Sequence, residues 1–502
     1  MIRKAVVEGG AVVGIPAADP RVTAFKGIPF AAPPVGENRW RAPQPVVPWE
    51  GERLCWTFAP ISMQHIPGLD KDNIYSREWN VDPEIPMDED CLYLNVWTPA
   101  KTPDEKLPVF VWYFGGGLKE GNPAEMEFDG ERIARRGIVV VTVNYRLNVF
   151  GFLAHPEITA QQPDFPGNFG FLDQRYGTMW VKRNIAAFGG DPNNITIGGQ
   201  SAGGGSVMAQ VVSPLNKGLF QRAICDSGLE LVPYKPGMIG PPATLKQHEE
   251  KGVAFFDLLG VKTLAEARAI DAERVRDVCV KNGLFFSMCI DGVMCPGFSN
   301  EMLVAGKADY IPLLCGHTAT EFPASPRGRT REEFEANVRA QFGADADEFL
   351  RLVASPTGSL KEMRYKSEMS HIGYTIRRFA RDKARRGDES PIYYWVFGPE
   401  IPGWDDPGAF HSSDLWFWFE TQAKCWRPFT GKHYDLARQM CNYWANFIRC
   451  GDPNGKDADG SDMPVWKPFT EAEPWRMLLG DKAVPECSEA GPVMEFVLDH
   501  AD

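Results

Sequence analysis

The stretch that decides the fold is Phe188-Gly-Gly-Asp-Pro-Asn-Asn-Ile-Thr-Ile-Gly-Gly-Gln-Ser-Ala-Gly203, which places one serine, Ser201, between Gly199 and Gly203. The β-branched run 195–197 predicts a strand, and the small and apolar residues 202–212 predict a helix that packs closely on a sheet. A strand that turns at once into a helix strains the residue at its apex and leaves no room for side chains two positions away. We therefore interpret the stretch as a nucleophile elbow, in which the Ser201 hydroxyl is held clear of the backbone.

Other near-continuous β-branched and aromatic runs surround this elbow in the sequence. Since such runs alternate with helical stretches, they predict a buried, mostly parallel sheet with helices on both faces, an α/β fold. The first hundred residues, rich in Pro and Gly, predict an antiparallel edge and long loops. The predicted strands are 109–113, 138–144, 195–197, 222–225, 311–315 and 392–396.

We expect residues 1–502 to form a single domain with a largely helical insertion at 232–387, where the sequence becomes charged. Helices are expected at 264–279 and 331–353, and the insertion is expected to form part of the substrate cleft. Near the C-terminus, apolar residues from 436 to 447 recur at helical spacing before Gly451, which predicts a packed amphipathic helix with a glycine stop.

Composition limits the classes of partner. The formal charge of −13 argues against nucleic acids and anionic membrane surfaces, since both bind basic patches. No stretch approaches the ~18 apolar residues needed to span a bilayer. Glu8 interrupts the N-terminal apolar run before a signal peptide could form, so we expect a cytoplasmic protein.

The 11 cysteines are scattered without metal-ligand spacing, and we expect reduced thiols, no metal and no cofactor. The oligomeric state stays open between monomer and homodimer.

A serine hydroxyl needs donors for the oxyanion, a base, and an acid that orients the base. Three glycines, 115–117, follow the strand 109–113, and their bare backbone lets N–H groups approach a reacting carbonyl. The amide of Ala202 begins the helix after Ser201, where the helix dipole favours negative charge. We therefore expect Gly116, Gly117 and Ala202 to form an oxyanion hole, although a flexible glycine turn is the alternative for the first two.

The base and the acid are chosen by position. His411 lies on a small-residue loop after the last predicted strand, where a base can project over the carboxyl edge of the sheet. Glu321 follows the strand ending at Cys315 and precedes His411 in the chain. Asp291 is a weaker rival for the acid, and Asp414 lies too close to His411 in sequence to be favoured.

At this point the chain resembles the type B carboxylesterases, the esterase, lipase and cholinesterase branch of the α/β-hydrolase fold. The resemblance covers nearly the whole chain and rests on several motifs besides the elbow and the segment Gly408-Ala-Phe-His411. It implies a triad of Ser201, Glu321 and His411, and it adds Ser227 as a hydroxyl behind the triad. The other motifs are Phe25-Lys-Gly-Ile-Pro-Phe-Ala-Ala-Pro-Pro-Val-Gly36, Glu89-Asp-Cys-Leu-Tyr-Leu-Asn-Val-Trp97, Asn144-Tyr-Arg-Leu-Asn-Val-Phe-Gly-Phe-Leu153 and Gly167-Asn-Phe-Gly-Phe-Leu-Asp-Gln-Arg175.

Four positions depart from the family pattern. Phe114 stands where histidine is common before the glycines, which removes a hydrogen bond that anchors the loop, and Gln200 replaces a glutamate before the nucleophile. Phe322 follows the acid where glycine is usual. Ser62 stands where the family places the disulfide partner of Cys91, so we expect no disulfide there.

The sequence thus predicts a serine carboxylic ester hydrolase that forms an acyl-enzyme on a small-molecule ester. The alternatives are amides, thioesters or lipid esters as substrates of the same groups, and a non-catalytic binding module on the same fold. Aromatic esters of the hydroxycinnamate type are a first guess, if aromatic side chains line the site. Packing of these rings in the core is the alternative. The candidate pocket residues are Phe114, Leu118, Trp416 and Phe417.

Overall fold

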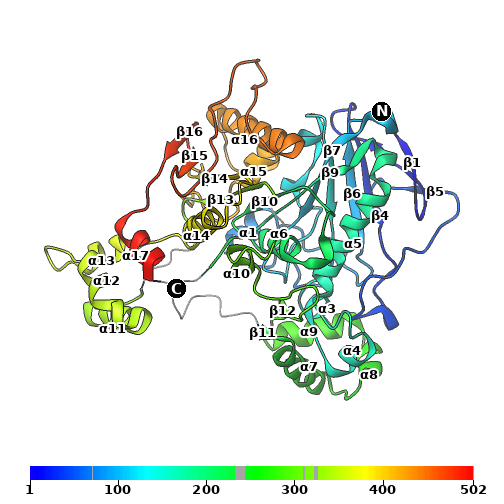
Figure 1. The fold of residues 1–502 in the computed structure, drawn as a ribbon. Helices are drawn as coiled ribbons and strands as arrows, with labels where there is room; N and C mark the ends of the chain where they lie inside the picture. The colour runs from blue at the N-terminus through cyan, green and yellow to red at the C-terminus, as the bar shows by residue number, and fades with distance from the viewer. Residues whose placement is uncertain (71, 232–242, 309–310, 322–325, 501–502) are drawn as a thin grey trace.

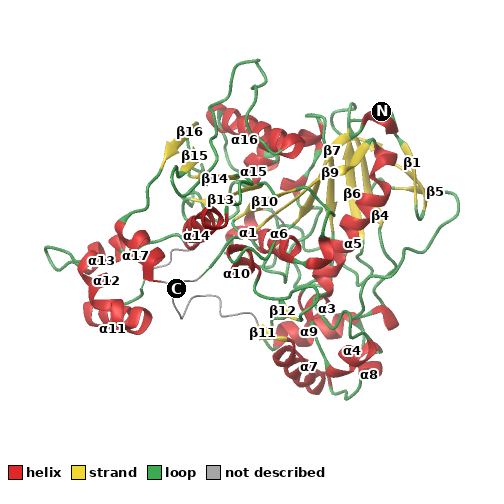
Figure 2. Ribbon diagram, viewed as in Figure 1, coloured by secondary structure: helices red, strands yellow, loops and turns green. Residues whose placement is uncertain are grey.

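A twisted sheet of 11 strands, ordered β16-β15-β14-β13-β10-β9-β7-β8-β6-β4-β3, forms the centre of the molecule. The computed structural model describes residues 1–502 except 71, 232–242, 309–310, 322–325 and 501–502 (Figure 1). Figure 2 shows the strands as a yellow fan with helices around it. Their bounds are β3 Ile15–Pro16, β4 Thr23–Pro29, β6 Tyr93–Thr98, β7 Leu107–Tyr113, β8 Val139–Val143, β9 Gly190–Gln200, β10 Arg222–Asp226, β13 Leu313–Thr318, β14 Ile392–Phe397, β15 Trp475–Leu479 and β16 Ala483–Cys487.

The strands from β8 to β15 pair in parallel, and the two margins of the sheet are antiparallel. This arrangement confirms the predicted α/β class and the antiparallel N-terminal edge. Because parallel strands point the same way, the segments that follow β7, β9, β10, β13 and β14 emerge at one edge of the sheet. Every candidate catalytic residue lies on one of these segments.

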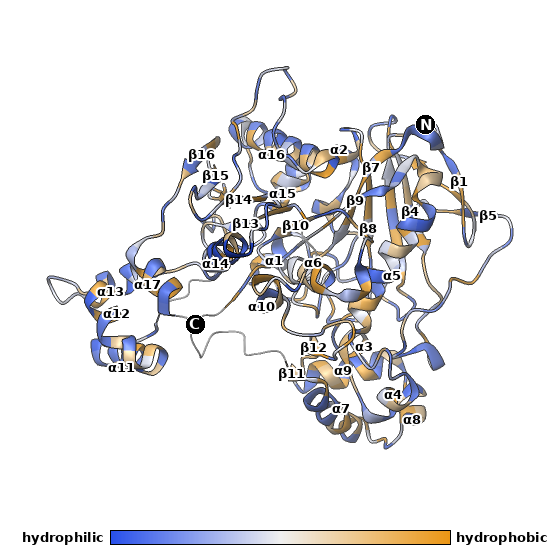
Figure 3. Ribbon diagram, in the orientation of Figure 1, coloured by the Kyte–Doolittle hydropathy of each residue, from blue (hydrophilic) through white to orange (hydrophobic). Residues whose placement is uncertain are grey.

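Both faces of the parallel strands are buried, which explains their uninterrupted apolar sequence (Figure 3). Trp112 of β7 points toward Trp444 of α16 (Gly431–Cys450), with ring centroids 5.8 Å apart. Its neighbour Val111 belongs to the core on the opposite face, together with Val207 of α6 (Ala202–Val212). Alternate residues of one strand therefore hold helices on opposite sides of the sheet.

The helices predicted after Ser201 and before Gly451 are confirmed. The helix α6 begins at Ala202 and ends at Val212, as the small and apolar residues indicated. The helix α16 ends at Gly451, which adopts a left-handed φ of 84° and donates its N–H to the Phe447 carbonyl. A glycine reaches this conformation without the cost that a Cβ imposes.

Most helices of region 232–387 form two groups that lie apart in Figure 1. The first group contacts the short helix α3 (Asn148–Phe152) and the two-stranded sheet of β11 (Ala243–Thr244) and β12 (Cys289–Ile290). The helix expected at 264–279 is broken before Asp271, which caps the second piece by accepting the Glu273 N–H. The second group packs with the C-terminal helix α17 (Pro492–His500) around Phe342, Phe349 and Phe496. The groups are α7 Leu245–Leu259, α8 Leu264–Arg268 and α9 Ala272–Lys281, and then α11 Arg331–Phe342, α12 Ala346–Leu352 and α13 Leu360–Lys366. The helices α10 (Ser299–Val304) and α14 (His371–Arg386) lie between the groups and pack against each other.

The sheet extends further than the sequence indicated. The last predicted strand was 392–396, but β15 and the edge strand β16 follow it and pair antiparallel with each other. Pro485 within β16 and the short length of both strands weaken their sequence signal. None of the helices within the described ranges is long and apolar enough to cross a membrane.

Candidate active site

Ser201 sits at the apex of a sharp turn between β9 and α6. Its φ of 57° and ψ of −125° place a non-glycine residue in a conformation that costs energy. A Cβ on Gly199 would lie 2.4 Å from the Gly203 carbonyl oxygen, and one on Gly203 would lie 2.1 Å from the Tyr113 carbonyl oxygen. Glycine is therefore required at both positions, for the steric reason that the sequence indicated.

The structure brings Ser201, His411 and Glu321 into one hydrogen-bonded chain. The Oγ of Ser201 lies 2.8 Å from Nε2 of His411, whose Nδ1 lies 2.7 Å from Oε2 of Glu321. The rival Asp291 lies elsewhere, where its carboxylate accepts from the Asn168 amide and from two backbone N–H groups. Asp414 is buried near His411, but Nδ1 is bonded to Glu321.

The charges of this chain suit a neutral base beside an ionised acid. Burial raises the pKa of Glu321, but the His411 imidazole and the Ser227 hydroxyl outweigh burial and bring this pKa to about 2. Burial likewise lowers the pKa of His411, but the attraction of the Glu321 carboxylate is stronger and the pKa ends above its ordinary value. The imidazolium formed after proton transfer from a serine is thus stabilised.

The glycine loop after β7 has a conformation that side chains would prevent. Gly116 and Gly117 adopt φ values of 93° and 65°. A Cβ on Gly116 would lie 2.0 Å from the Glu120 carbonyl oxygen. No backbone hydrogen bond within the described part of the chain uses the N–H of either glycine. The Ala202 N–H begins α6 and has no intrahelical acceptor, so these amides are available to an oxyanion.

Two side chains from other segments, Tyr145 and Gln64, anchor this loop, in which Phe114 replaces the histidine of the family pattern. The Tyr145 hydroxyl donates to the Phe114 carbonyl at 2.7 Å, and the two rings stack with centroids 4.3 Å apart. Gln64 accepts from the Gly121 N–H at 2.8 Å and donates to the Gly121 carbonyl at 3.0 Å. The hydrogen bond expected to be lost with Phe114 is therefore replaced by contacts from other segments.

Gln200 and Ser227 flank the hydrogen-bonded chain. The Gln200 amide nitrogen lies 3.3 Å from Nε2 of His411. The Ser227 hydroxyl donates to Oε1 of Glu321 at 2.6 Å, on the side away from His411. The departure at Phe322 lies outside the described residues.

All four candidate pocket residues are buried, but their surroundings differ. Leu118 is 9% exposed and Trp416 only 1%. Phe417 has no exposed surface and packs edge-on against Phe397 and Phe429. Phe417, like Phe114 with its stacking partner, thus has the environment of a core ring, which was the alternative for the aromatic run.

An aromatic cluster beside His411 was missed by the sequence analysis. Trp79 stacks on Phe410, with centroids 6.5 Å apart, and its ring lies 6.1 Å from that of Trp416. Tyr75 on α1 (Ile74–Glu78) contacts both Trp79 and Phe410. Burial, followed by the nearby Glu321 charge, raises the pKa of Tyr75 to about 12. The helix-capping Asn73 was the one local signal of α1 in a region interpreted as loops.

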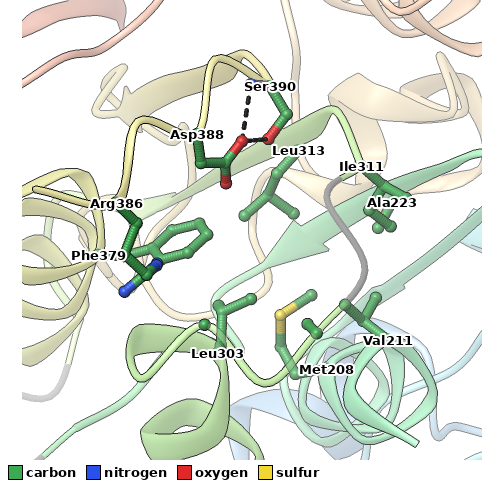
Figure 4. A pocket seen from close by; sticks show the side chains of 12 residues that line it. Met208, Val211, Ala223, Leu303, Ile311, Leu313, Phe379, Arg386, Asp388 and Ser390 are labelled. Atoms are coloured by element: carbon green, nitrogen blue, oxygen red, sulfur yellow. Dashed lines mark hydrogen bonds between the residues drawn. The ribbon is translucent and has the colours of Figure 1, made fainter. Parts of the chain in front are cut away.

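A pocket between the sheet, α6 and α14 lies away from these groups (Figure 4). It is lined by Met208, Leu303 and Phe379, and by Ala223 and Leu313 near the amino ends of their strands. Ser201 and His411 lie at the opposite edge of the sheet. Its cavity volume of about 20 Å³ holds roughly one water molecule, so it is too small for an ester substrate.

The predicted absence of a disulfide at Cys91 agrees with its surroundings. All eleven cysteines lie within the described residues, and each is a free thiol. Burial raises the pKa of the Cys91 thiol to about 12, although the neighbouring Ser62 hydroxyl acts to lower it. Ser62 thus occupies the place from which a second thiol could reach Cys91.

Comparison with known proteins places this geometry in a family. The carboxylesterase family model matches residues 3–490. Human cocaine esterase is 30% identical over 96% of this chain and 88% of its own length, and a medium-chain fatty acyl-CoA hydrolase precursor of Anas platyrhynchos is 32% identical over 89% and 83%. Fumonisin B1 esterase of Sphingopyxis macrogoltabida is 35% identical over 68% of this chain, a match that spans 61% of that enzyme.

Solved structures agree with the family match over the full length. A PNB esterase superposes with a TM-score of 0.80 at 28% identity, covering 99% of both chains. A carboxylesterase of Geobacillus stearothermophilus gives a TM-score of 0.77 at 28% identity, covering 99% of this chain and 100% of that one. The chain therefore belongs to the carboxylesterase family, and it is a carboxylic ester hydrolase of the α/β-hydrolase fold.

Proposed function

We propose that the protein hydrolyses carboxylic esters by covalent catalysis at Ser201, with His411 as general base and Glu321 as the group that orients it. The observation that carries the proposal is the unbroken chain of contacts at 2.8 and 2.7 Å from the Ser201 hydroxyl to the Glu321 carboxylate. The strained backbone of Ser201 supports its role as the nucleophile, and the unbonded amides of Gly116 and Gly117 support an oxyanion hole.

In the first half-reaction, His411 takes the proton of Ser201 as Oγ attacks the ester carbonyl carbon. The carbonyl oxygen becomes an oxyanion, which accepts hydrogen bonds from the amides of Gly116, Gly117 and Ala202. The imidazolium then gives its proton to the alcohol oxygen as the carbon–oxygen bond breaks. In the second half-reaction, His411 deprotonates a water as the water oxygen attacks the acyl carbon. The bond between this carbon and Ser201 Oγ then breaks, the acid leaves, and the imidazolium returns its proton to Oγ.

The proposed substrates are small to medium esters, and aromatic esters in particular. Tyr75, Trp79 and Phe410 form an aromatic wall next to His411 that can pack against an aryl group, and the buried Trp416 supports this wall from behind. The names of the relatives include both ester and acyl-CoA hydrolases, so a thioester belongs in any test of substrate range.

The direct test replaces the nucleophile. Ser201→Ala should lower ester turnover by several orders of magnitude with an unchanged thermal unfolding midpoint. An organophosphate should label the wild-type peptide that contains Ser201, as read by mass spectrometry, and leave the variant unlabelled. The exposed Ser461→Ala serves as the control and should keep both activity and labelling. Esterase activity retained in Ser201→Ala would exclude the proposed nucleophile.

Substrate class is tested with p-nitrophenyl esters of increasing acyl length, methyl ferulate and one acyl thioester. The aromatic wall predicts that kcat/KM for methyl ferulate exceeds that for aliphatic methyl esters, and that Trp79→Ala removes the difference. A steep preference for long acyl chains would contradict the aryl assignment and indicate a lipid ester.

A further inference from the structure

Two buried carboxyl groups lie behind the proposed triad, at positions that the reaction does not use. Asp226 ends β10, and Asp414 follows His411 by three residues; neither has any exposed surface. Their side chains are in hydrogen-bonding contact with each other. Within the described part of the chain, Oδ2 of Asp226 and Oδ1 of Asp414 have no conventional donor. Two buried carboxylate oxygens in such contact require a proton between them.

Counting protons at Ser227 indicates which carboxyl group holds it. The Ser227 Oγ lies 2.6 Å from Oε1 of Glu321 and 3.1 Å from Oδ1 of Asp226. A serine hydroxyl carries one hydrogen, and the shorter contact to an ionised acceptor takes it. Asp226 therefore faces two groups, Ser227 and Asp414, that have no hydrogen to give it.

Asp414 has the surroundings of the charged partner. The Trp418 indole N–H donates to its Oδ2 at 3.4 Å, and the His411 imidazole lies close enough to favour its ionised form. Burial raises the pKa of both aspartates, and so does the Glu321 charge. The pKa of Asp226, which also faces the Asp414 charge, ends well above its ordinary value.

We propose that Asp226 is held neutral, that it donates its proton to Asp414, and that this pair positions Ser227 so that its hydroxyl stays on Glu321. The proposal deepens the proposed function, on which it rests. A neutral Asp226 cannot compete as an anion for the Ser227 hydrogen. Oε1 of Glu321 then accepts from the Ser227 hydroxyl and, at 3.1 Å, from the Thr318 hydroxyl. Oε2 of Glu321 stays bonded to His411.

The other charged groups that face the site fix the sign of the expected pH effects. Glu321, Asp414 and Glu230 all raise the pKa of His411, whereas burial lowers it. His317, whose pKa burial lowers, lies near Glu321. Removing the Asp414 charge should therefore lower the pKa of His411, whereas replacing an already neutral Asp226 should leave it in place.

The first experiment measures kcat/KM against pH for three variants of the full chain. Asp414→Asn should move the acid limb to lower pH. Asp226→Ala should lower kcat/KM about tenfold or more because Ser227 loses its neighbour, and Asp226→Asn should restore most of that loss with the acid limb unmoved. An acid limb that shifts as far in Asp226→Asn as in Asp414→Asn would overturn the neutral assignment, as would an unmoved limb in Asp414→Asn.

The second experiment does not depend on turnover. The infrared difference spectrum between wild type and Asp226→Asn at neutral pH should contain the carbonyl band of a protonated carboxyl group. A difference confined to carboxylate bands would overturn the proposal even if Ser201→Ala abolishes activity. Conversely, an active Ser201→Ala variant would contradict the proposed function and leave this band in place, so the two failures are distinguishable.

Discussion

Gly116→Ala tests whether the glycine loop supplies the oxyanion donors. The new Cβ would lie 2.0 Å from the Glu120 carbonyl oxygen, so the loop must move by about 1 Å to restore an ordinary contact. Donors act only within about 2.7–3.1 Å of the oxyanion, so a shift of this size removes at least one of them. The loss of one donor lowers kcat by about 10²–10³, or ~2.7–4 kcal/mol of transition-state stabilisation.

Gly137→Ala is the matched control for this change. Gly137 adopts a comparable left-handed φ of 80°, but its Cβ would meet no atom within 4 Å. It precedes β8, at the edge of the sheet opposite to Ser201. Both variants carry the backbone cost of about 1–2 kcal/mol, but only Gly116→Ala disturbs the donors.

The assay is kcat/KM for p-nitrophenyl acetate, together with urea unfolding of wild type and both variants. We expect Gly137→Ala to lose stability and keep activity, and Gly116→Ala to lose both. Activity of Gly116→Ala within about threefold of wild type would refute the reasoning, since a displaced donor costs far more. An equal activity loss in Gly137→Ala would trace the effect to stability instead.

Three further predictions follow from other contacts. Because His411 must be neutral to accept a proton and its pKa is raised, kcat/KM should fall as the pH falls through a midpoint above ~6.5; a lower midpoint in a pH profile would contradict this. Ser62→Cys should form a disulfide with Cys91 under oxidising conditions, and closing a loop of about 30 residues should raise stability by ~3–4 kcal/mol. The urea midpoints of the oxidised and reduced variant measure this gain, and a thiol titration that finds no bond would count against it. Arg146→Ala leaves a buried carboxylate unpaired and should cost ~3–5 kcal/mol in urea unfolding. Its control Arg339→Ala removes an exposed ion pair and should cost under ~1 kcal/mol, and equal costs would refute the argument.

The local parts of the fold could be predicted because their signals are local. The elbow required glycines at 199 and 203, and the structure places a carbonyl oxygen where each Cβ would be. The helix from Ala202 to Val212 and the glycine that ends α16 were read from neighbouring residues alone. The strands β15 and β16 were missed because a short strand at the edge of a sheet is stabilised mainly by pairing with its neighbour, and its own sequence carries little signal.

The surroundings of the site could be predicted less well. Position in the chain led to Glu321 rather than Asp291, since a strand end indicates which edge of the sheet a residue reaches. Trp79 and Tyr75 were missed because they lie on or just after a short helix in a loop region and contact Phe410, the neighbour of His411, only through tertiary packing. Phe417 follows His411 closely in sequence but packs in the core against Phe397 and Phe429, because the whole of α15 (Leu415–Trp418) is buried.

By itself, the sequence determined the elbow, the order of the reacting groups and the α/β class, because each depends on the steric demands of adjacent residues or on strand direction. Only the tertiary structure decided which charges surround those groups. Asp226 and Asp414 are 188 residues apart in the chain, yet they meet behind Glu321, where neither side chain has any exposed surface. Their protonation depends on burial and on each other, and neither quantity is encoded in the residues next to them.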